Sequence, residues 1–191
     1  MIIKRNTLQE IMDTGLILVQ ERGYNGFSYA DIADAIGIRK ASIHYHFPSK
    51  QDLVQAVLRR YRKEFMYKLQ QINDQDPSGK QKLESFFKLY RETLENNTKL
   101  CLCSMMAAEL NSFPTEIRDE LNQFFKANTV WAHDVLEQGK SSGEFSFSNS
   151  ALGQAKTLIA FVQGAQLLSR TSGDIGYYDS LVSGYISSVV Q

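Results

Sequence analysis

The sequence predicts an all-α protein, in which a small N-terminal helical domain precedes a larger helical body with about nine helices altogether. Its 191 residues include only three prolines, and apolar residues recur every three or four positions, which is the helical period. No convincing stretch alternates between apolar and polar residues, so strands are not needed. With 43% hydrophobic and 22% charged residues, the composition is that of a globular protein.

Polar caps and glycines mark the first two helices. Asn6 is suited to cap a helix that Gly23 ends, and Gln9 stands where it can complete a capping box with Asn6. Ser28 caps a short second helix and places Asp31 at its positive end. The inward-facing positions of these helices are Leu8, Ile11, Met12, Gly15 and Val19, followed by Ile32, Ala33 and Ile36.

A glycine turn and a proline delimit the next two helices. Gly37 makes a tight turn, and residues 39–46 then form a third short helix. Pro48 breaks that helix, and Ser49 caps a long fourth helix that reaches about Ile72. The inner face of the fourth helix carries Leu53, Val57, Tyr61, Phe65 and Leu69.

The polar, proline- and glycine-containing stretch 73–79 is the strongest break in the chain and predicts a boundary between a small front domain and the rest. Pro114 suits the first turn of a long helix that ends by Gly139. The helices expected beyond the break span about 80–96, 100–111, 114–139, 149–171 and 177–190.

Charge distribution and composition exclude several classes of protein. The net charge is zero, yet residues 1–63 carry ten basic and six acidic side chains. We therefore expect that only this front end meets a polyanion. The chain has no apolar run long enough for a membrane span and no secretory signal, and its two cysteines fit a reducing interior. These features predict a cytoplasmic protein.

The segment 27–53 carries the strongest functional signal. Two short helices joined through Gly37, the second with cationic and hydrogen-bonding side chains, are typical of a helix-turn-helix that places its second helix in the major groove of DNA. The apolar residues expected to hold the two helices together are Ile36, Ile43 and Phe47. The side chains left to point outward are Arg39, Lys40, Ser42, His44 and Tyr45. The alternative is that these charges form an ordinary solvated face.

The tract from Gly37 to Lys50 resembles the DNA-binding domain of the TetR family of bacterial transcriptional regulators. It reads as a glycine turn, a basic pair, a small residue, an aromatic run and then Phe-Pro-Ser-Lys, and the resemblance covers about residues 7–60. Two positions depart from the family's common pattern, Ala41 where glycine is frequent and His44 where tyrosine is common. Because histidine and tyrosine offer different hydrogen-bonding groups, the operator sequence of a relative does not predict that of this protein.

The resemblance implies a set of DNA contacts and a domain division. The residues that read or approach bases would be Arg39, Lys40, Ser42 and His44. Those that contact phosphates would be Ser28, Tyr29, Tyr45, His46 and Lys50. The DNA-binding domain would span 1–48, and an effector-binding and dimerisation domain would span 49–191, with the helix 49–73 connecting the two.

The resemblance also implies that the body binds a small effector and that its last two helices form a homodimer interface. The candidates for lining a pocket for an apolar or aromatic effector are Phe86, Phe87, Tyr90, Leu94, Cys101, Met105, Met106, Phe124, Phe125, Trp131, His133 and Phe161. The dimerisation candidates are Leu152, Ala155, Ile159, Ala160, Val162, Gly164, Gln166, Leu181, Val182, Tyr185, Ile186 and Val189. The alternative for both sets is ordinary intrachain core.

The cysteines leave a further question open. The stretch that begins at Cys101 is similar to a segment in a branch of the family that includes electrophile-sensing repressors, whereas a small buried residue is the plainer interpretation. On a helix the thiols of Cys101 and Cys103 diverge, so no metal site or other cofactor is expected.

The predicted function is therefore that of a sequence-specific DNA-binding regulator, a repressor released from a palindromic operator by an effector. The alternatives are an activator or effector-independent regulator of the same fold, or an enzyme that uses the aromatic body. No nucleophile elbow, phosphate loop or acid–base pair supports an enzyme.

Overall fold

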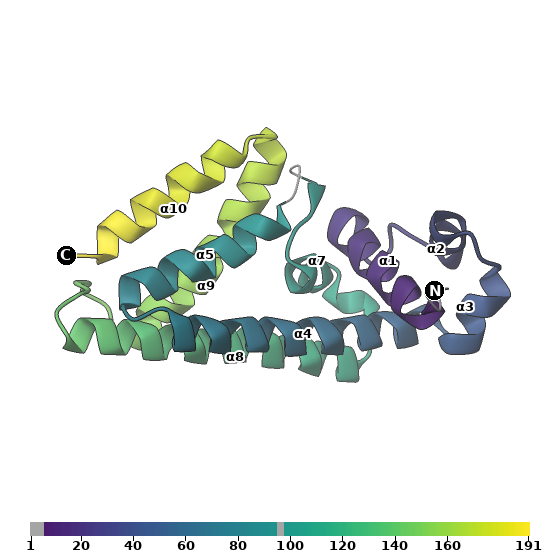
Figure 1. Ribbon diagram of the computed structural model, residues 1–191, viewed down its shortest axis with the longest axis horizontal. Helices are drawn as coiled ribbons and strands as arrows, with labels where there is room; N and C mark the ends of the chain where they lie inside the picture. Colours follow the sequence, from purple (N-terminus) through teal and green to yellow (C-terminus); the bar gives the residue numbers. More distant parts are fainter. Residues whose placement is uncertain (1–5, 95–97) are drawn as a thin grey trace, which may run out of the picture. The chain divides into compact units, whose positions relative to one another are not determined.

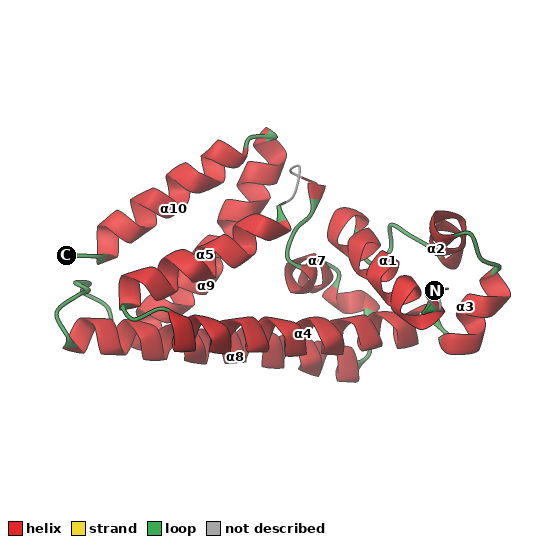
Figure 2. Ribbon diagram, in the orientation of Figure 1, coloured by secondary structure: helices red, strands yellow, loops and turns green. Residues whose placement is uncertain are grey.

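A computed structural model of the chain describes residues 6–94 and 98–191, which are mostly helical (Figures 1 and 2). The helices are α1 (Thr7–Arg22), α2 (Tyr29–Ile36), α3 (Lys40–His46), α4 (Lys50–Gln75), α5 (Gly79–Thr93), α7 (Leu102–Ala108), the 3₁₀ turn η1 (Leu110–Ser112), α8 (Thr115–Ser141), α9 (Ala151–Ser172) and α10 (Ile175–Val189). Within these two ranges no strand forms, although one isolated antiparallel bridge pairs Phe145 with Val190. The predicted all-α class is confirmed.

The predicted caps form at α1 and α2, with one exception. The Asn6 side chain accepts a hydrogen bond from the backbone N–H of Gln9 at 3.3 Å. The Gln9 side chain does not return to Asn6, because its Nε2 donates to Asp13 one turn further on, at 3.0 Å. The expected capping box of α1 is therefore only half formed, whereas the box between Ser28 and Asp31 at the start of α2 is complete.

Helix lengths differ from the prediction by a few residues. Helix α4 continues past Ile72 to Gln75, and α8 continues past Gly139 to Ser141. Helix α7 ends early, and η1 follows it within the range predicted as one helix. The last two residues of the predicted helix 80–96, and the basic residues Lys4 and Arg5, lie outside the described residues.

The described residues form two compact units that are not continuous in sequence. The first consists of the chain up to Arg62 together with Leu102–Leu121, and the second of Lys63–Cys101 together with Asn122–Gln191. Helices α4 and α8 therefore each contribute residues to both units. This division differs from the sequence boundaries expected near residue 48 and at 73–79, since α7 and the start of α8 return to the first unit.

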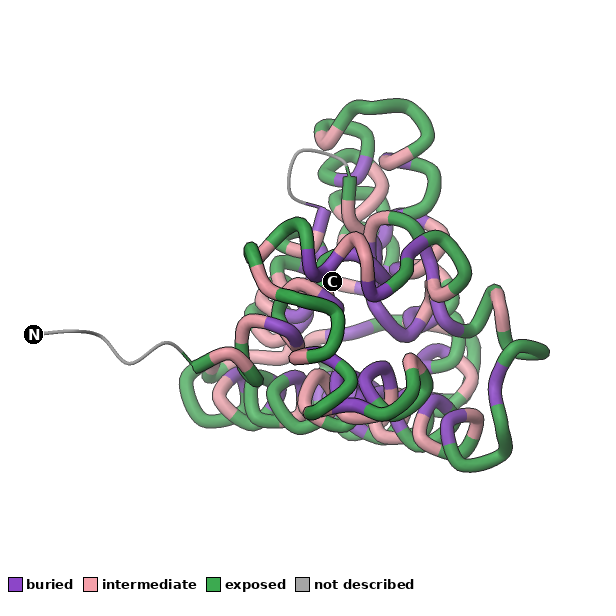
Figure 3. Tube along the Cα trace, turned by 90° about the vertical axis from the view of Figure 1, so that its right-hand side faces the viewer, coloured by how far each residue is buried: buried purple, intermediate pink, exposed green. Residues whose placement is uncertain are grey.

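The core of the first unit is aliphatic. Helix α1 packs against α2 and α7, and α2 packs against α3. A Cβ added at Gly15 would lie 3.4 Å from Leu53 Cδ2, so the glycine lets α1 approach α4 closely. The completely buried side chains include those of Ile11, Val19, Ile32, Ile43, Leu53 and Val54. Figure 3 marks such buried residues, which recur along the helices between exposed ones.

The second unit has an aromatic core. Helix α9 packs against α5 and α10, and α10 also packs against α5. The rings of Phe86 and Trp131 stack with their centroids 5.0 Å apart, and those of Phe65 and Phe124 meet edge to face at 5.2 Å. Since aromatic side chains bury large apolar areas, this cluster contributes strongly to the hydrophobic stabilisation of the unit.

Candidate nucleic-acid interface

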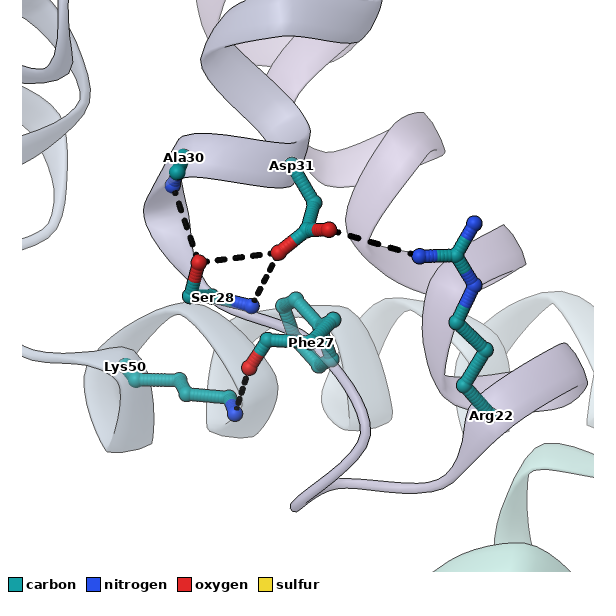
Figure 4. Close-up of polar contacts among 6 residues, drawn as sticks. All are labelled: Arg22, Phe27, Ser28, Ala30, Asp31 and Lys50. Atoms are coloured by element: carbon teal, nitrogen blue, oxygen red, sulfur yellow. Dashed lines mark hydrogen bonds and ion pairs between the residues drawn. The ribbon is translucent and has the colours of Figure 1, made fainter.

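The start of α2 is fixed by a local network of hydrogen bonds (Figure 4). The Asp31 carboxylate accepts hydrogen bonds from the Ser28 backbone N–H at 2.7 Å and from the Ser28 hydroxyl at 2.8 Å. Arg22 of α1 pairs with the other carboxylate oxygen at 3.3 Å. The hydrogen bonds from Ser28, more than the charge of Arg22, hold the pKa of Asp31 below its usual range. Ser28 itself stays exposed, as a phosphate contact requires.

Tyr29 is not placed as the sequence led us to expect. Only 8% of this residue is exposed. Its hydroxyl lies 2.6 Å from the carbonyl oxygen of Ser49 and 3.0 Å from that of Phe47, so it donates into the junction between α3 and α4. Burial raises the pKa of the phenol to about 12. In this conformation the hydroxyl is used inside the domain, so the predicted phosphate contact would require it to turn outward.

Lys50 also turns inward. Its ammonium donates to the carbonyl oxygen of Phe27 and lies 4.1 Å from the centroid of the Phe27 ring and 4.5 Å from that of Tyr24. Burial lowers the pKa of Lys50. Cation–π contacts and a carbonyl hold this cation against the α1–α2 turn, so the predicted phosphate contact would require the ammonium to leave them.

Helix α3 separates an apolar side from a polar side. Gly37 adopts φ +66°, a left-handed conformation that favours glycine, and so allows α2 to end and the chain to turn into α3. Ile43 is completely buried and Phe47 is 7% exposed, as predicted for residues that hold the helix in place, whereas Ile36 is only half-buried. The opposite side of α3 is thereby turned to solvent.

The solvent side of α3 carries most of the residues predicted to contact bases. Arg39, Lys40 and His44 are exposed and Ser42 is half-buried. Tyr45 is 84% exposed, which is far more than an aromatic ring needs for packing. His44 contacts its own domain through its Nδ1, which lies 3.3 Å from the carbonyl oxygen of Pro48, and through its ring, which meets that of Tyr29 edge to face at 4.9 Å.

A groove of about 550 Å³ runs beside this face. Its lining residues are Thr7, Ile38, Arg39, Ala41, Ser42, Tyr45 and His46. Sequence analysis did not single out Thr7 and Ile38. The sequence places Thr7 directly after the Asn6 cap and Ile38 directly after Gly37, and neither position by itself indicates a binding surface.

The predicted effector residues are packed against one another or separated. Those on α5 and at its C-cap are buried, with Phe86, Phe87, Tyr90 and Leu94 at most 2% exposed. Most belong to the second unit, but Met105 and Met106 of α7 belong to the first. Phe124, Trp131 and Cys101 are also buried, and Phe125, His133 and Phe161 are half-buried. The structure thus brings the second-unit residues together as an aromatic core, the alternative left open above.

The predicted dimer residues divide into two groups. The side chains buried within the single chain are those of Ala155, Ile159, Val162, Gln166, Tyr185 and Val189. These six side chains pack within the single chain, which is the alternative left open for them. The accessible ones are Leu152, Ala160, Gly164, Leu181, Val182 and Ile186. Sequence analysis missed three exposed apolar neighbours, Leu167, Leu168 and Tyr177.

Both cysteines are fully buried. The backbone N–H of Cys101 donates to the Gln166 side chain at 3.2 Å. A sensor thiol needs access to its electrophile. In this conformation both cysteines fit the role of a small buried residue better than that of a sensor.

Two protein-family models match the chain. Residues 11–57 match bacterial regulatory proteins of the tetR family, and residues 79–184 match tetracyclin repressor-like C-terminal domains. The chain belongs to the TetR family. As a member of this family it is a DNA-binding transcriptional regulator, and the exposed face of α3 lies within the first matched segment.

Solved and curated relatives agree with this assignment. A TetR transcriptional regulator from Legionella pneumophila is 34% identical, with all of both chains covered and a TM-score of 0.87. A TetR family regulator from Agrobacterium tumefaciens is 29% identical over 96% of this chain and 97% of its own, with a TM-score of 0.91. The HTH-type transcriptional repressor KstR2 of Mycolicibacterium smegmatis is 28% identical over 141 residues, which are 71% of this chain and 66% of that protein.

None of the helices in the ranges 6–94 and 98–191 combines the length and the apolar character that crossing a membrane requires.

Proposed function

We propose that this TetR family member is a cytoplasmic repressor rather than an enzyme. It binds a palindromic operator as a homodimer and leaves it when a small apolar or aromatic effector binds the second unit. The exposed polar face of α3 carries the proposal. The KstR2 relative bears the name of a transcriptional repressor, which supports repression as the direction of control.

The geometry of α3 supports reading of the major groove. That groove is about 12 Å wide and admits one helix, whose N-terminal residues reach the base edges. Arg39 and Lys40 stand at the N-terminal end of α3 and are exposed, while Ile43 anchors the other side of the helix in the core. Arg39 can offer two parallel donors to a guanine, and His44 and Tyr45 add donors and acceptors further along the helix.

Exposed apolar side chains on α9 support the homodimer. Leu152 is 46% exposed and Leu167 is 55% exposed. At 100° per residue, Leu152, Ala160 and Leu167 lie within about 80° of the helix circumference, so they form one stripe. Leu168 of α9 and Tyr177 of α10 extend the exposed apolar surface. Two copies joined through this surface would present two α3 helices, which matches the two halves of a palindrome.

The aromatic core supports an apolar or aromatic effector. The rings of Phe86, Trp131, Phe124 and Phe161 lie in the second unit and match the polarity of such a ligand, which would have to separate packed rings in order to bind between them. An effector that prefers the conformation with poor DNA affinity lowers the affinity of the protein for DNA. By thermodynamic linkage, bound DNA lowers the affinity for the effector by the same factor.

Selection of bound duplexes from a random DNA pool tests the proposal. We expect the wild-type protein to enrich an inverted repeat. We expect Arg39→Ala to bind that repeat about 1–3 kcal/mol more weakly, the usual cost of losing a base contact. Lys126→Ala serves as the control, since Lys126 is an exposed cation of the second unit. If no sequence is enriched, the proposed function fails.

A further inference from the structure

The turn between α1 and α2 is held by a carboxylate from a distant part of the chain. Glu109, between α7 and η1, accepts hydrogen bonds from the backbone N–H groups of Tyr24 at 2.7 Å and Asn25 at 3.0 Å. It also accepts one from the Asn25 side chain. Two consecutive N–H groups on one carboxylate form a charge-assisted contact, which is stronger than a hydrogen bond between neutral groups.

Neighbouring residues reinforce the same contact. The Asn25 amide also donates to the Ser112 hydroxyl at 3.1 Å. The Tyr24 and Phe113 rings meet edge to face at 4.8 Å. Three residues of the segment 109–113 (Glu109, Ser112 and Phe113) therefore contact the turn, and all of them belong to the first unit.

Gly23 shows how closely the carboxylate approaches. Its φ is +79°, and a Cβ added there would lie 2.2 Å from Glu109 Oε1. Only a residue without a side chain leaves room for this approach. Lys50 holds the other end of the turn through the carbonyl oxygen of Phe27, so the turn is fixed both where it leaves α1 and where it enters α2.

We propose that Glu109 is a positioning residue for DNA binding. It touches no DNA in this assignment, but it fixes the turn that leads directly to Ser28 and Tyr29, and thus the start of α2. Tyr29 in turn donates its hydroxyl into the α3–α4 junction. Loosening the turn lowers the fraction of molecules whose α3 is aligned for DNA, and the apparent dissociation constant rises by the same factor. The inference rests on the proposed DNA-binding function.

The sign of the effect separates positioning from electrostatics. Glu109→Gln removes a negative charge, and a change of charge alone would strengthen binding to a polyanion. Positioning has the opposite consequence, because the glutamine amide offers one neutral oxygen in place of two charged ones, so one of the two backbone N–H groups loses its acceptor. We expect operator affinity to fall about tenfold, which corresponds to about 1.4 kcal/mol. We also expect the slope of log K against log salt to stay unchanged, since no phosphate contact is lost.

Glu144 provides a matched control. Its carboxylate accepts hydrogen bonds from the backbone N–H groups of Gly79 at 2.9 Å and Lys80 at 2.8 Å, at the start of α5 in the second unit. Glu144→Gln therefore makes the same chemical change to the same kind of contact. Each variant is measured by fluorescence anisotropy on the selected operator, at a temperature where circular dichroism shows it fully folded. We expect Glu144→Gln to keep wild-type affinity or to bind slightly more tightly.

A second pair of variants tests the contact without altering charge. Gly23→Ala and Gly143→Ala each place a Cβ on a backbone of positive φ, +79° and +77°, but a Cβ at Gly143 meets nothing within 4 Å. We expect Gly23→Ala to lose operator affinity and Gly143→Ala to keep it. Adding Glu109→Ala to Gly23→Ala should cause less further loss of affinity than Glu109→Ala causes alone, since the clash has already displaced the carboxylate.

Three results would overturn the proposal. These are unchanged or tighter binding by folded Glu109→Gln, an equal loss in Glu144→Gln, or a reduced salt slope. Arg39→Ala distinguishes a failure of this inference from a failure of the proposed function. If Arg39→Ala weakens binding and Glu109→Gln does not, only the positioning role is lost. If the wild-type protein binds no preferred sequence, the function itself fails.

Discussion

Replacing Tyr29 by phenylalanine tests how the helix-turn-helix is held together. The substitution removes one hydroxyl and keeps the buried ring. A net intramolecular hydrogen bond contributes about 0.5–1.5 kcal/mol, and a buried group left without its partner costs about 1–3 kcal/mol. The Ser49 carbonyl oxygen keeps a second donor, the Leu53 N–H at 3.3 Å, so mainly Phe47 loses a partner. We expect Tyr29→Phe to lower the free energy of unfolding by about 1–2 kcal/mol.

Urea denaturation followed by circular dichroism measures this loss, and its pH dependence adds a second signature. The pKa of Tyr29 is raised from 10.0 to about 12 in the folded protein, so the folded state holds this proton more tightly than the unfolded chain. The stability linked to this proton is complete below pH 10 and is lost as the pH rises through about 12. The difference in free energy of unfolding between the wild-type protein and Tyr29→Phe should therefore narrow between pH 10 and about pH 12.

The same variant decides between an internal and a DNA-contacting hydroxyl. If the hydroxyl works inside the domain, Tyr29→Phe loses stability but, at a temperature where it is fully folded, keeps wild-type operator affinity. A phosphate contact would instead weaken operator binding by the folded variant by about 0.5–1.5 kcal/mol, the net contribution of one hydrogen bond. Unchanged stability together with this loss of affinity would refute the reasoning and restore Tyr29 to the DNA surface.

Three further predictions concern the packing of the core, the stability at low pH and the dimer interface. Phe47→Ala should lower the free energy of unfolding by about 3–5 kcal/mol in urea titrations, because it empties a buried site under α3; a loss below 1 kcal/mol would contradict this. Asp31→Asn should be less stable than wild-type at pH 7. That gap should close as the pH falls below 3.8, because the pKa of Asp31 is lowered by folding, and a gap that persists at pH 2 would exclude the carboxylate as its source. Leu168→Glu should shift the protein to monomers in analytical ultracentrifugation, whereas Leu110→Glu, an exposed leucine of the first unit, should not; a Leu168→Glu dimer would place the interface elsewhere.

Local features of the fold could be predicted because their chemistry lies within a few residues. The Ser28 and Asp31 side chains satisfy N–H groups of the same turn, so the cap was visible in the sequence. Gly37 was recognisable for the same reason, since a left-handed turn between two short helices favours glycine. The buried role of Ile43 followed from helical spacing.

Features that depend on residues far apart in the chain were not visible. Nothing in the spacing of Lys50 indicates that its ammonium turns back onto Phe27, and a surface lysine was the natural expectation. Glu109 carried no motif at all, although it holds a turn more than 80 residues earlier. Periodicity marked Ala155 and Val162 as apolar, but it could not tell a face packed within the chain from one packed on a partner.

Chemical protection of the operator tests the central claim most directly. Dimethyl sulfate methylates guanine N7, which lies in the major groove, where a recognition helix would cover it. We predict that the wild-type protein protects guanines in two half-sites spaced one helical turn, about 34–36 Å, or a multiple of it apart. We also predict that, at protein concentrations that saturate the operator, Arg39→Ala leaves open the guanine that Arg39 contacts in each half-site. Bound DNA whose guanine N7 atoms all react as in free DNA would contradict the placement of α3 in the major groove.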